Sequence, residues 1–354
     1  MEAKTKLWLV VSVVCLASNC MQRSVHGESQ VPCLFIFGDS LSDSGNNNRL
    51  RRTTTKTNYR PYGIDFPLGP TGRFTNGQTS VDLIGQHLGF ENFIPPFSYI
   101  GGSDILKGVN YASGGAGIRH ESGKHMGANV NLGAQMLNHR IIYSKIGIKI
   151  GGSEKAKQYL NKCLYYVNIG SNDYINNYFL PQFYPSSHIY TLNQYSDILI
   201  ALMSQHIQVL REEYGARKFV LVGIGHIGCT PNVVSRNGSC DEEMNSAAHM
   251  FNVKLKSLVD QFNNNFIDDS KFIFIDSSAG TLDSFSVVDA SCCSSGTNGL
   301  CVPNETPCQN RTTYMFWDEF HPTEAANRII AMNSYNASNP AFTYPMDIKH
   351  LVQS

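Results

Sequence analysis

The stretch VPCLFIFGDSL, residues 31–41, decides the fold, because an unbroken apolar run ends at Gly38 and is followed at once by Asp39 and Ser40. Similar short runs recur along the chain. None of them alternates apolar and polar residues, so both faces of the strands they form are expected to be covered. We predict five strands of one sheet: Val31–Phe37, Gly108–Tyr111, Leu164–Ile169, Lys218–Val222 and Lys271–Ile275.

Between these runs, apolar residues recur at steps of three and four, which predicts helices. The clearest pattern runs from Met244 to Phe262, and Ser239 with Glu242 predicts a capping box before it. Alternating strands and helices predict a parallel sheet with helices on both faces. No long linker or internal repeat interrupts residues 28–354, so we predict a single α/β domain there. In such sheets the ligand site lies beyond the carboxyl ends of the strands.

Three predicted strands deliver polar or glycine residues to that edge. The first runs into Ser40, the second into the glycine cluster NYASGGAG at 110–117, and the third into Asn172. Taken alone, a serine after a strand is more often a turn or cap residue than a nucleophile. Together, however, a serine hydroxyl, backbone N–H groups at a glycine turn and an amide are the parts that acyl transfer needs.

Near the C-terminus, FWDEFHP at 316–322 supplies a base and a carboxylate. Pro322 disfavours helical geometry for the residue before it, so His321 is expected at the entry of the following helix. A turn can bring Asp318 to His321. An imidazole with an ordinary pKa near 6.5 can take a serine proton and return it to a leaving group, while a carboxylate orients the ring. These residues and Ser40 predict nucleophilic acyl transfer.

The order of the motifs resembles the GDSL esterase/lipase family, the SGNH hydrolases, in its plant secreted form. The resemblance covers nearly the whole chain after residue 27. It implies a three-layer α/β fold with a five-stranded parallel sheet of flavodoxin-like order. It also implies that Ser40 is the nucleophile, His321 the general base and Asp318 the residue that orients the base. The matching blocks are FGDSLSDSGNNN from Phe37, PYGIDFPLGPTGRFTNGQTSVDLIG from Pro61, NYASGGAG from Asn110, NIGSNDY from Asn168, GIGHIGCTPN from Gly223 and FWDEFHPTEAAN from Phe316.

The same resemblance implies three donors for the oxyanion of the tetrahedral intermediate. They are the Ser40 N–H, a glycine N–H and the Asn172 side chain. We place the glycine at Gly114, with Gly115 as the close competitor. Two departures from the family pattern fall outside these residues. His226 stands where relatives often have proline, and residues 283–289 (DSFSVVD) lack the Pro and Gly-Phe usual there. Both change loops expected to face the substrate.

The N-terminus predicts a secreted, extracellular protein. Lys4 and Lys6 precede the apolar run Leu7–Ala17, which is too short for a membrane span and fits a signal peptide over residues 1–27. Eight of the ten cysteines follow residue 27, an even number that suggests disulfides whose pairing cannot be deduced. The N-x-[ST] sequences predict possible N-glycan acceptors at four positions: Asn237, Asn304, Asn310 and Asn336.

Composition excludes other classes of protein. The 28 Lys and Arg residues balance 28 Asp and Glu residues, so the chain lacks the basic excess of a nucleic-acid binder. We expect a small-molecule ester or lipid substrate and no stable membrane span. We also expect no cofactor and no metal. The sequence has no C-x-x-C pair, and His120 and His125 are one residue too far apart for a helical zinc-protease motif.

Three functions remain open. The first is a secreted serine hydrolase that cleaves carboxylic esters of lipids or small acyl groups through an acyl-serine. The second is an acyltransferase in which an alcohol replaces water, and no sequence feature separates it from the first. The third is a non-catalytic secreted glycoprotein of the same fold, against which the intact set of motifs argues.

Overall fold

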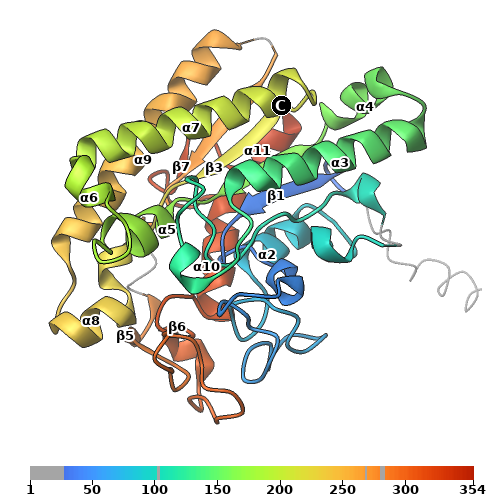
Figure 1. Ribbon diagram of the computed structural model, residues 1–354. Helices are drawn as coiled ribbons and strands as arrows, with labels where there is room; N and C mark the ends of the chain where they lie inside the picture. The colour runs from blue at the N-terminus through green and yellow to red at the C-terminus, as the bar shows by residue number, and fades with distance from the viewer. Residues whose placement is uncertain (1–27, 102–103, 268, 280–283) are drawn as a thin grey trace, which may run out of the picture.

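The structure is a computed structural model, and it describes residues 28–101, 104–267, 269–279 and 284–354 (Figure 1). The predicted signal peptide, residues 1–27, lies outside the described residues. No helix within these ranges is long and apolar enough to cross a membrane.

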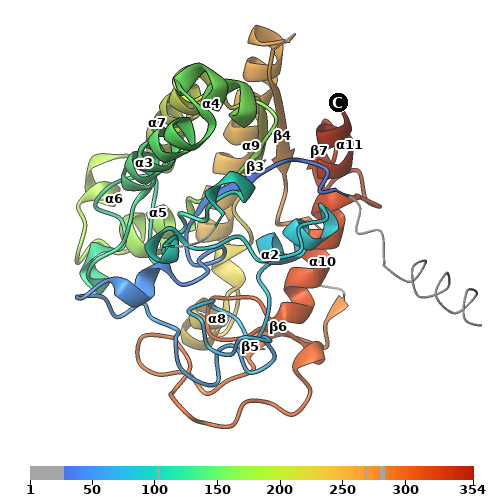
Figure 2. The ribbon, with the colours of Figure 1, turned by 90° about the vertical axis from the view of Figure 1, so that its right-hand side faces the viewer.

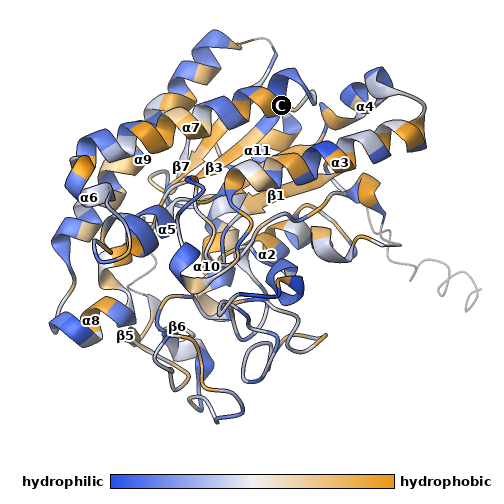
Figure 3. Cartoon of the chain, viewed as in Figure 1, coloured by the Kyte–Doolittle hydropathy of each residue, from blue (hydrophilic) through white to orange (hydrophobic). Residues whose placement is uncertain are grey.

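The central sheet has five strands in the order β1-β2-β3-β4-β7. The first four strands run parallel, and β7 pairs antiparallel with β4. The predicted α/β class is confirmed, and two strands match their predicted bounds residue for residue. Apolar residues concentrate on these strands (Figure 3) because both faces of the sheet are covered. The bounds are β1 (Leu34–Gly38), β2 (Leu164–Asn168), β3 (Lys218–Val222), β4 (Lys271–Ile275) and β7 (Thr343–Tyr344).

The predicted strand at Gly108–Tyr111 forms only two isolated bridges, from Asn110 to Ile36 and to Pro96. The segment does lie beside β1, where flavodoxin-like order places a second strand, and the Tyr111 N–H donates to Ile36 O at 2.7 Å. Gly108 has a φ of 115°, which bends the segment away from a strand. The Asn110 side chain bonds to Ser42 O and to the N–H two residues on. The segment thus stays hydrogen-bonded to β1 without forming a regular strand, and the fifth strand of the sheet is the antiparallel β7.

Helices cover both faces of the sheet and make three layers (Figure 2). Phe35, Tyr165 and Phe219 pack into one apolar cluster with the first group of helices, and Leu34 and Tyr166 pack into another with the second group. Successive strand residues therefore serve opposite cores. The first group is α3 (Leu132–Ile150), α4 (Ser153–Leu160), α7 (Leu192–Glu212) and α9 (Glu242–Asn265). The second is α2 (Ser80–His87), α10 (Glu324–Tyr335) and α11 (Ile348–Gln353).

The start of α9 corrects one prediction. The apolar stripe from Met244 to Phe262 is buried as expected, but the N-cap is Asp241. Its carboxylate accepts the N–H groups of Glu243 and Met244. The predicted box at Ser239 and Glu242 is wrong because the helix begins at Glu242, which places Asp241 and not Ser239 at the N-cap.

A second, smaller unit lies beyond the carboxyl ends of the parallel strands. It contains the two-stranded sheet β5 (Val287–Ser291) and β6 (Tyr314–Phe316) and a small apolar cluster around Trp317. The eight cysteines of the described ranges form four disulfides: Cys33–Cys163, Cys229–Cys240, Cys292–Cys308 and Cys293–Cys301. The short helical segments are η1 (Asn46–Arg49), η2 (Phe97–Tyr99), η3 (Ile105–Lys107), η4 (Lys124–Met126), α5 (Ser171–Asp173), η5 (Tyr174–Tyr178), α6 (Ser186–Ile189), η6 (Ile227–Cys229), α8 (Pro231–Asn237) and η8 (Arg311–Thr313).

Candidate active site

Ser40 lies in the tight turn that ends β1. The turn begins at Gly38, where a Cβ would come within 2.8 Å of Asn168 O on the neighbouring strand. The Asp39 N–H donates to that same Asn168 O at 3.2 Å, and Asp39 Oδ1 accepts the Leu41 N–H at 3.0 Å. The backbone is therefore held on both sides of Ser40, and the hydroxyl lines a cavity beyond the sheet edge.

The structure brings Ser40, His321 and Asp318 together in a line. Ser40 Oγ lies 2.8 Å from His321 Nε2. The other ring nitrogen, Nδ1, lies 2.8 Å from each oxygen of Asp318, and the His321 N–H also donates to Asp318 Oδ1 at 2.8 Å. The Phe74 ring packs against the imidazole at 4.9 Å between centroids. This arrangement holds the ring between a hydroxyl and a carboxylate, the geometry in which an imidazole can act as a base.

Asp318 is fully buried, and one of its hydrogen bonds comes from a distant residue that the sequence argument missed. The Tyr62 hydroxyl, also buried, donates to Asp318 Oδ2 at 2.6 Å. Burial, together with the charge of Asp318, raises the pKa of Tyr62 well above its usual value, so the phenol stays protonated and remains a donor. Tyr62 stands in the PYGID part of a block quoted above, but nothing in the block indicates that it reaches a carboxylate 256 positions later.

The hydrogen bonds of the glycine turn distinguish the two candidate oxyanion donors, Gly114 and Gly115. The Gly114 N–H donates to Asp43 Oδ2 at 3.0 Å, and a Cβ at Gly114 would lie 2.4 Å from Phe74 Cζ. This N–H is therefore already engaged and the residue is packed away from the cavity. Gly115, the competitor, lines the cavity. Within the part of the chain that the structure describes, the N–H groups of Gly115 and Ser40 donate to no protein acceptor.

Asn172 follows β2 in the short helix α5 and also lines the cavity. Its Nδ2 donates to Ala116 O at 3.0 Å, and its Oδ1 accepts the Asn176 Nδ2–H at 2.6 Å. One hydrogen of the amide is thereby used to hold the side chain, and the second is left for a ligand. An amide, two backbone N–H groups and a hydroxyl thus belong to residues that line the same cavity.

Buried carboxyl groups shape the turns beside Ser40. Asp43 Oδ1 accepts the N–H groups of Gly45 and Asn46, each at 2.7 Å, while Oδ2 holds the glycine turn. Burial raises the pKa of Asp43 to about 6 against these hydrogen bonds, which lower it. Burial likewise raises the pKa of Asp39 to about 7. The contacts of Asp43 thus extend from the turn after Ser40 to the glycine turn, the second loop of the site.

The cavity has a volume of about 590 Å³. Its wall mixes apolar and polar side chains, and it includes His226, one of the two departures from the family pattern. Phe183, at its mouth, is 59% exposed and its ring stacks on that of His125. Apolar residues of the wall include Leu41, Met126, Ile175, Leu180, Leu300 and Phe320.

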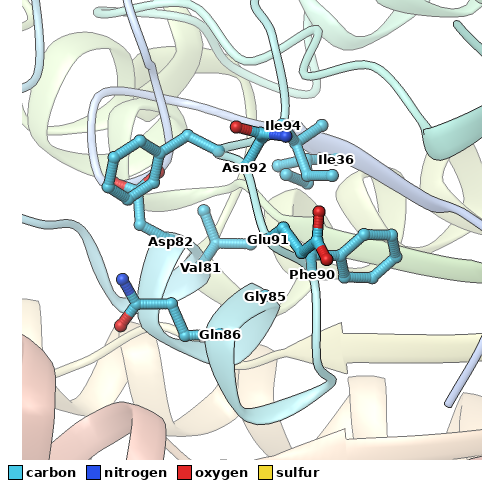
Figure 4. A pocket seen from close by; sticks show the side chains of 10 residues that line it. Ile36, Val81, Asp82, Gly85, Gln86, Phe90, Glu91, Asn92 and Ile94 are labelled. Carbon is cyan, nitrogen blue, oxygen red and sulfur yellow. The ribbon is translucent and has the colours of Figure 1, made fainter. Parts of the chain in front are cut away.

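Another hollow offers no comparable chemistry. It lies between α2 and the segment that follows it and has a volume of about 30 Å³, room for about one or two waters (Figure 4). Asp82 lines it, but the Arg73 guanidinium binds both oxygens of this carboxylate at 2.7 Å. Among the described residues, no group of three or more His, Cys, Asp and Glu residues could hold a metal ion.

Comparisons with known proteins agree with the motifs. The sequence profile of the GDSL-like Lipase/Acylhydrolase family matches residues 34–333. Two GDSL esterases/lipases of Arabidopsis thaliana are each 46% identical over 368 residues, which covers the whole of both chains in each comparison. A third from the same plant is 43% identical and covers 99% of each chain. The chain therefore belongs to the GDSL-like lipase/acylhydrolase family.

Proposed function

We propose that the protein hydrolyses carboxylic esters, of lipids or of small acyl groups, through an acyl intermediate on Ser40. The observation that carries this proposal is the continuous line of short contacts from Asp318 through His321 to Ser40 Oγ, which opens on the cavity. The family membership and the names of the plant relatives support the same reaction class.

In the first half of the reaction, His321 Nε2 takes the Ser40 proton as Oγ attacks the ester carbon. The bond from Oγ to the acyl carbon forms, and the negative charge moves to the former carbonyl oxygen. We assign that oxygen to the N–H groups of Ser40 and Gly115 and to the Asn172 amide. Collapse of the intermediate breaks the bond to the alcohol oxygen, and His321 returns its proton to this leaving group.

In the second half, water attacks the acyl-serine while His321 Nε2 takes one of its protons. The carboxylic acid leaves and Ser40 recovers its hydrogen from the imidazolium. Asp318 stabilises the positive ring in both halves and stays ionised.

The test is the Ser40→Ala variant. The purified variant should release no p-nitrophenol from p-nitrophenyl butyrate above the buffer rate and should not be labelled by a fluorophosphonate probe, while its circular dichroism stays that of the wild type. Full activity in folded, uncontaminated Ser40→Ala protein would end the assignment. Analysis of products formed with added alcohols separates hydrolysis from acyl transfer.

We also propose that residues 28–354 form one secreted domain that follows a cleaved signal peptide at 1–27. Four disulfides within the described ranges support an oxidising compartment. The four N-x-[ST] asparagines are exposed, which supports their use as glycan acceptors: Asn237, Asn304, Asn310 and Asn336. Recovery from the culture medium of a secreting host, with a mass lowered by an N-glycosidase, tests both points.

A further inference from the structure

We propose that Tyr62 is a positioning residue for this reaction: its phenol holds Asp318 in line with His321 and limits the basicity of the carboxylate. The inference rests on the proposed function, since it assigns Tyr62 a part in the work of the same base. It concerns a group that does not itself line the cavity.

The contact is short and entirely enclosed. Tyr62 and Asp318 are each 0% exposed, and the hydroxyl lies 2.6 Å from Asp318 Oδ2. The same hydroxyl accepts the Cys301 N–H at 3.0 Å, which orients its own hydrogen toward the carboxylate. A phenol with one donor behind it and one acceptor in front has a single favourable rotor position, so the bond to Asp318 is fixed in direction.

Cys301, which donates to the Tyr62 hydroxyl, is held by a second tyrosine and by a disulfide. The Tyr59 hydroxyl donates to Cys301 O at 2.8 Å, so both backbone polar groups of Cys301 are held by tyrosines. Cys301 is joined to Cys293, whose N–H donates to Trp317 O at 2.9 Å, next to the acid. Tyr62 therefore connects the Asp318 carboxylate by hydrogen bonds to a loop whose position is fixed by a disulfide.

The electrostatic role follows from the partners of Asp318. Its Oδ1 accepts the N–H groups of Phe320 and His321, and Oδ2 accepts the Tyr62 hydroxyl, while the imidazole faces both oxygens. A hydrogen bond to a carboxylate draws charge from it and lowers its proton affinity. Without the phenol, Asp318 carries more charge toward the ring, which stabilises the imidazolium and favours the protonated, inactive base at a higher pH. Oδ1 keeps its contact with Nδ1 because two backbone N–H groups hold it, while Oδ2 loses the bond that fixes its position and with it the alignment of the ring.

The decisive variant is Tyr62→Phe, with Tyr59→Phe as the matched control. Tyr59 lies beside Tyr62, with ring centroids 5.4 Å apart, and bonds to the same loop, but its hydroxyl donates to Cys301 O and not to Asp318. For Tyr62→Phe we expect a fall in kcat of about tenfold or more, the loss expected for a hydrogen bond to a charged group. KM should change less than twofold, and the acid limb of the kcat/KM profile should move to higher pH. Tyr59→Phe should keep the wild-type profile.

A Tyr62→Phe profile that does not move, whether or not kcat falls, would show a merely structural role and overturn the inference. If Tyr62→Phe does not fold, 3,5-difluorotyrosine at position 62 keeps the shape and strengthens the donor. Its acid limb should move to lower pH, and an unmoved limb overturns the inference. Failure of the proposed function looks different, because Ser40→Ala would then retain activity whatever happens at Tyr62.

Discussion

Replacing Asn172 with alanine tests the oxyanion site without touching the nucleophile or its base. One hydrogen of the Asn172 amide donates to Ala116 O at 3.0 Å, and the second is left for a ligand in the cavity. Loss of one oxyanion donor typically costs about 2.7–4 kcal/mol of barrier, which is about 100- to 1,000-fold in kcat. Because this donor acts on charge that develops only in the transition state, KM should change little.

The assay is release of p-nitrophenol from p-nitrophenyl butyrate, divided by the concentration of serine that a fluorophosphonate probe labels to completion. Asn176→Ala is the matched control, because Asn176 lines the same cavity and donates to Asn172 Oδ1 at 2.6 Å. It removes an amide of the same size but leaves the assigned donor, so its kcat should fall less than about tenfold. An Asn172→Ala enzyme that loses no more kcat than Asn176→Ala would refute the oxyanion assignment.

Three further changes test the surroundings of the site. Asp43→Asn removes the carboxylate that accepts the Gly114 N–H. Because a buried N–H without a partner costs about 1–3 kcal/mol, both kcat and the melting temperature should fall. An unchanged kcat would contradict the role of this contact. Burial lowers the pKa of His139 to about 3 from 6.5, so the folded protein binds fewer protons than the unfolded chain and loses stability as the pH falls from about 6.5 toward 3. His139→Gln should therefore show a smaller drop in melting temperature between pH 7 and pH 4.5, and equal drops in the two proteins would refute the linkage. The Cys33–Cys163 disulfide joins residues 130 positions apart and so restricts the unfolded chain. Replacing both cysteines with alanine should lower the free energy of unfolding, measured in urea, by about 4–5 kcal/mol. A change below about 1 kcal/mol would argue against this chain-entropy account.

Much of the sheet could be predicted because each buried strand is a short, self-contained signal. Lys218–Val222 and Lys271–Ile275 form strands over the predicted residues, since apolar runs of this length need cover on both faces wherever they lie in the chain. The segment 108–111 carries a similar run and failed as a strand. Its Asn110 side chain donates to Ser42 O, an acceptor that belongs to a distant part of the chain and that no local pattern indicates.

The glycine turn shows the same limit at the site. Gly114 and Gly115 are adjacent and identical in type, so no local rule separates them. The Asp43 carboxylate, 71 positions earlier, takes the N–H of Gly114, and Gly115 is left facing the cavity. Tyr62 and the pairing of the cysteines escaped prediction for the same reason, because each depends on a partner chosen by packing.

The sequence by itself determined which chemical groups this protein possesses and at which edge of a sheet they gather, because strand periodicity and turn residues act locally. It therefore predicted Ser40, Asp318 and His321 as a set. The tertiary structure alone decided which N–H faces the cavity, which phenol touches the buried acid and how the imidazole meets a hydroxyl 281 positions away at 2.8 Å. Those choices are matters of distance and direction between segments far apart in the chain, and hydrogen bonds discriminate them on a scale of tenths of an ångström.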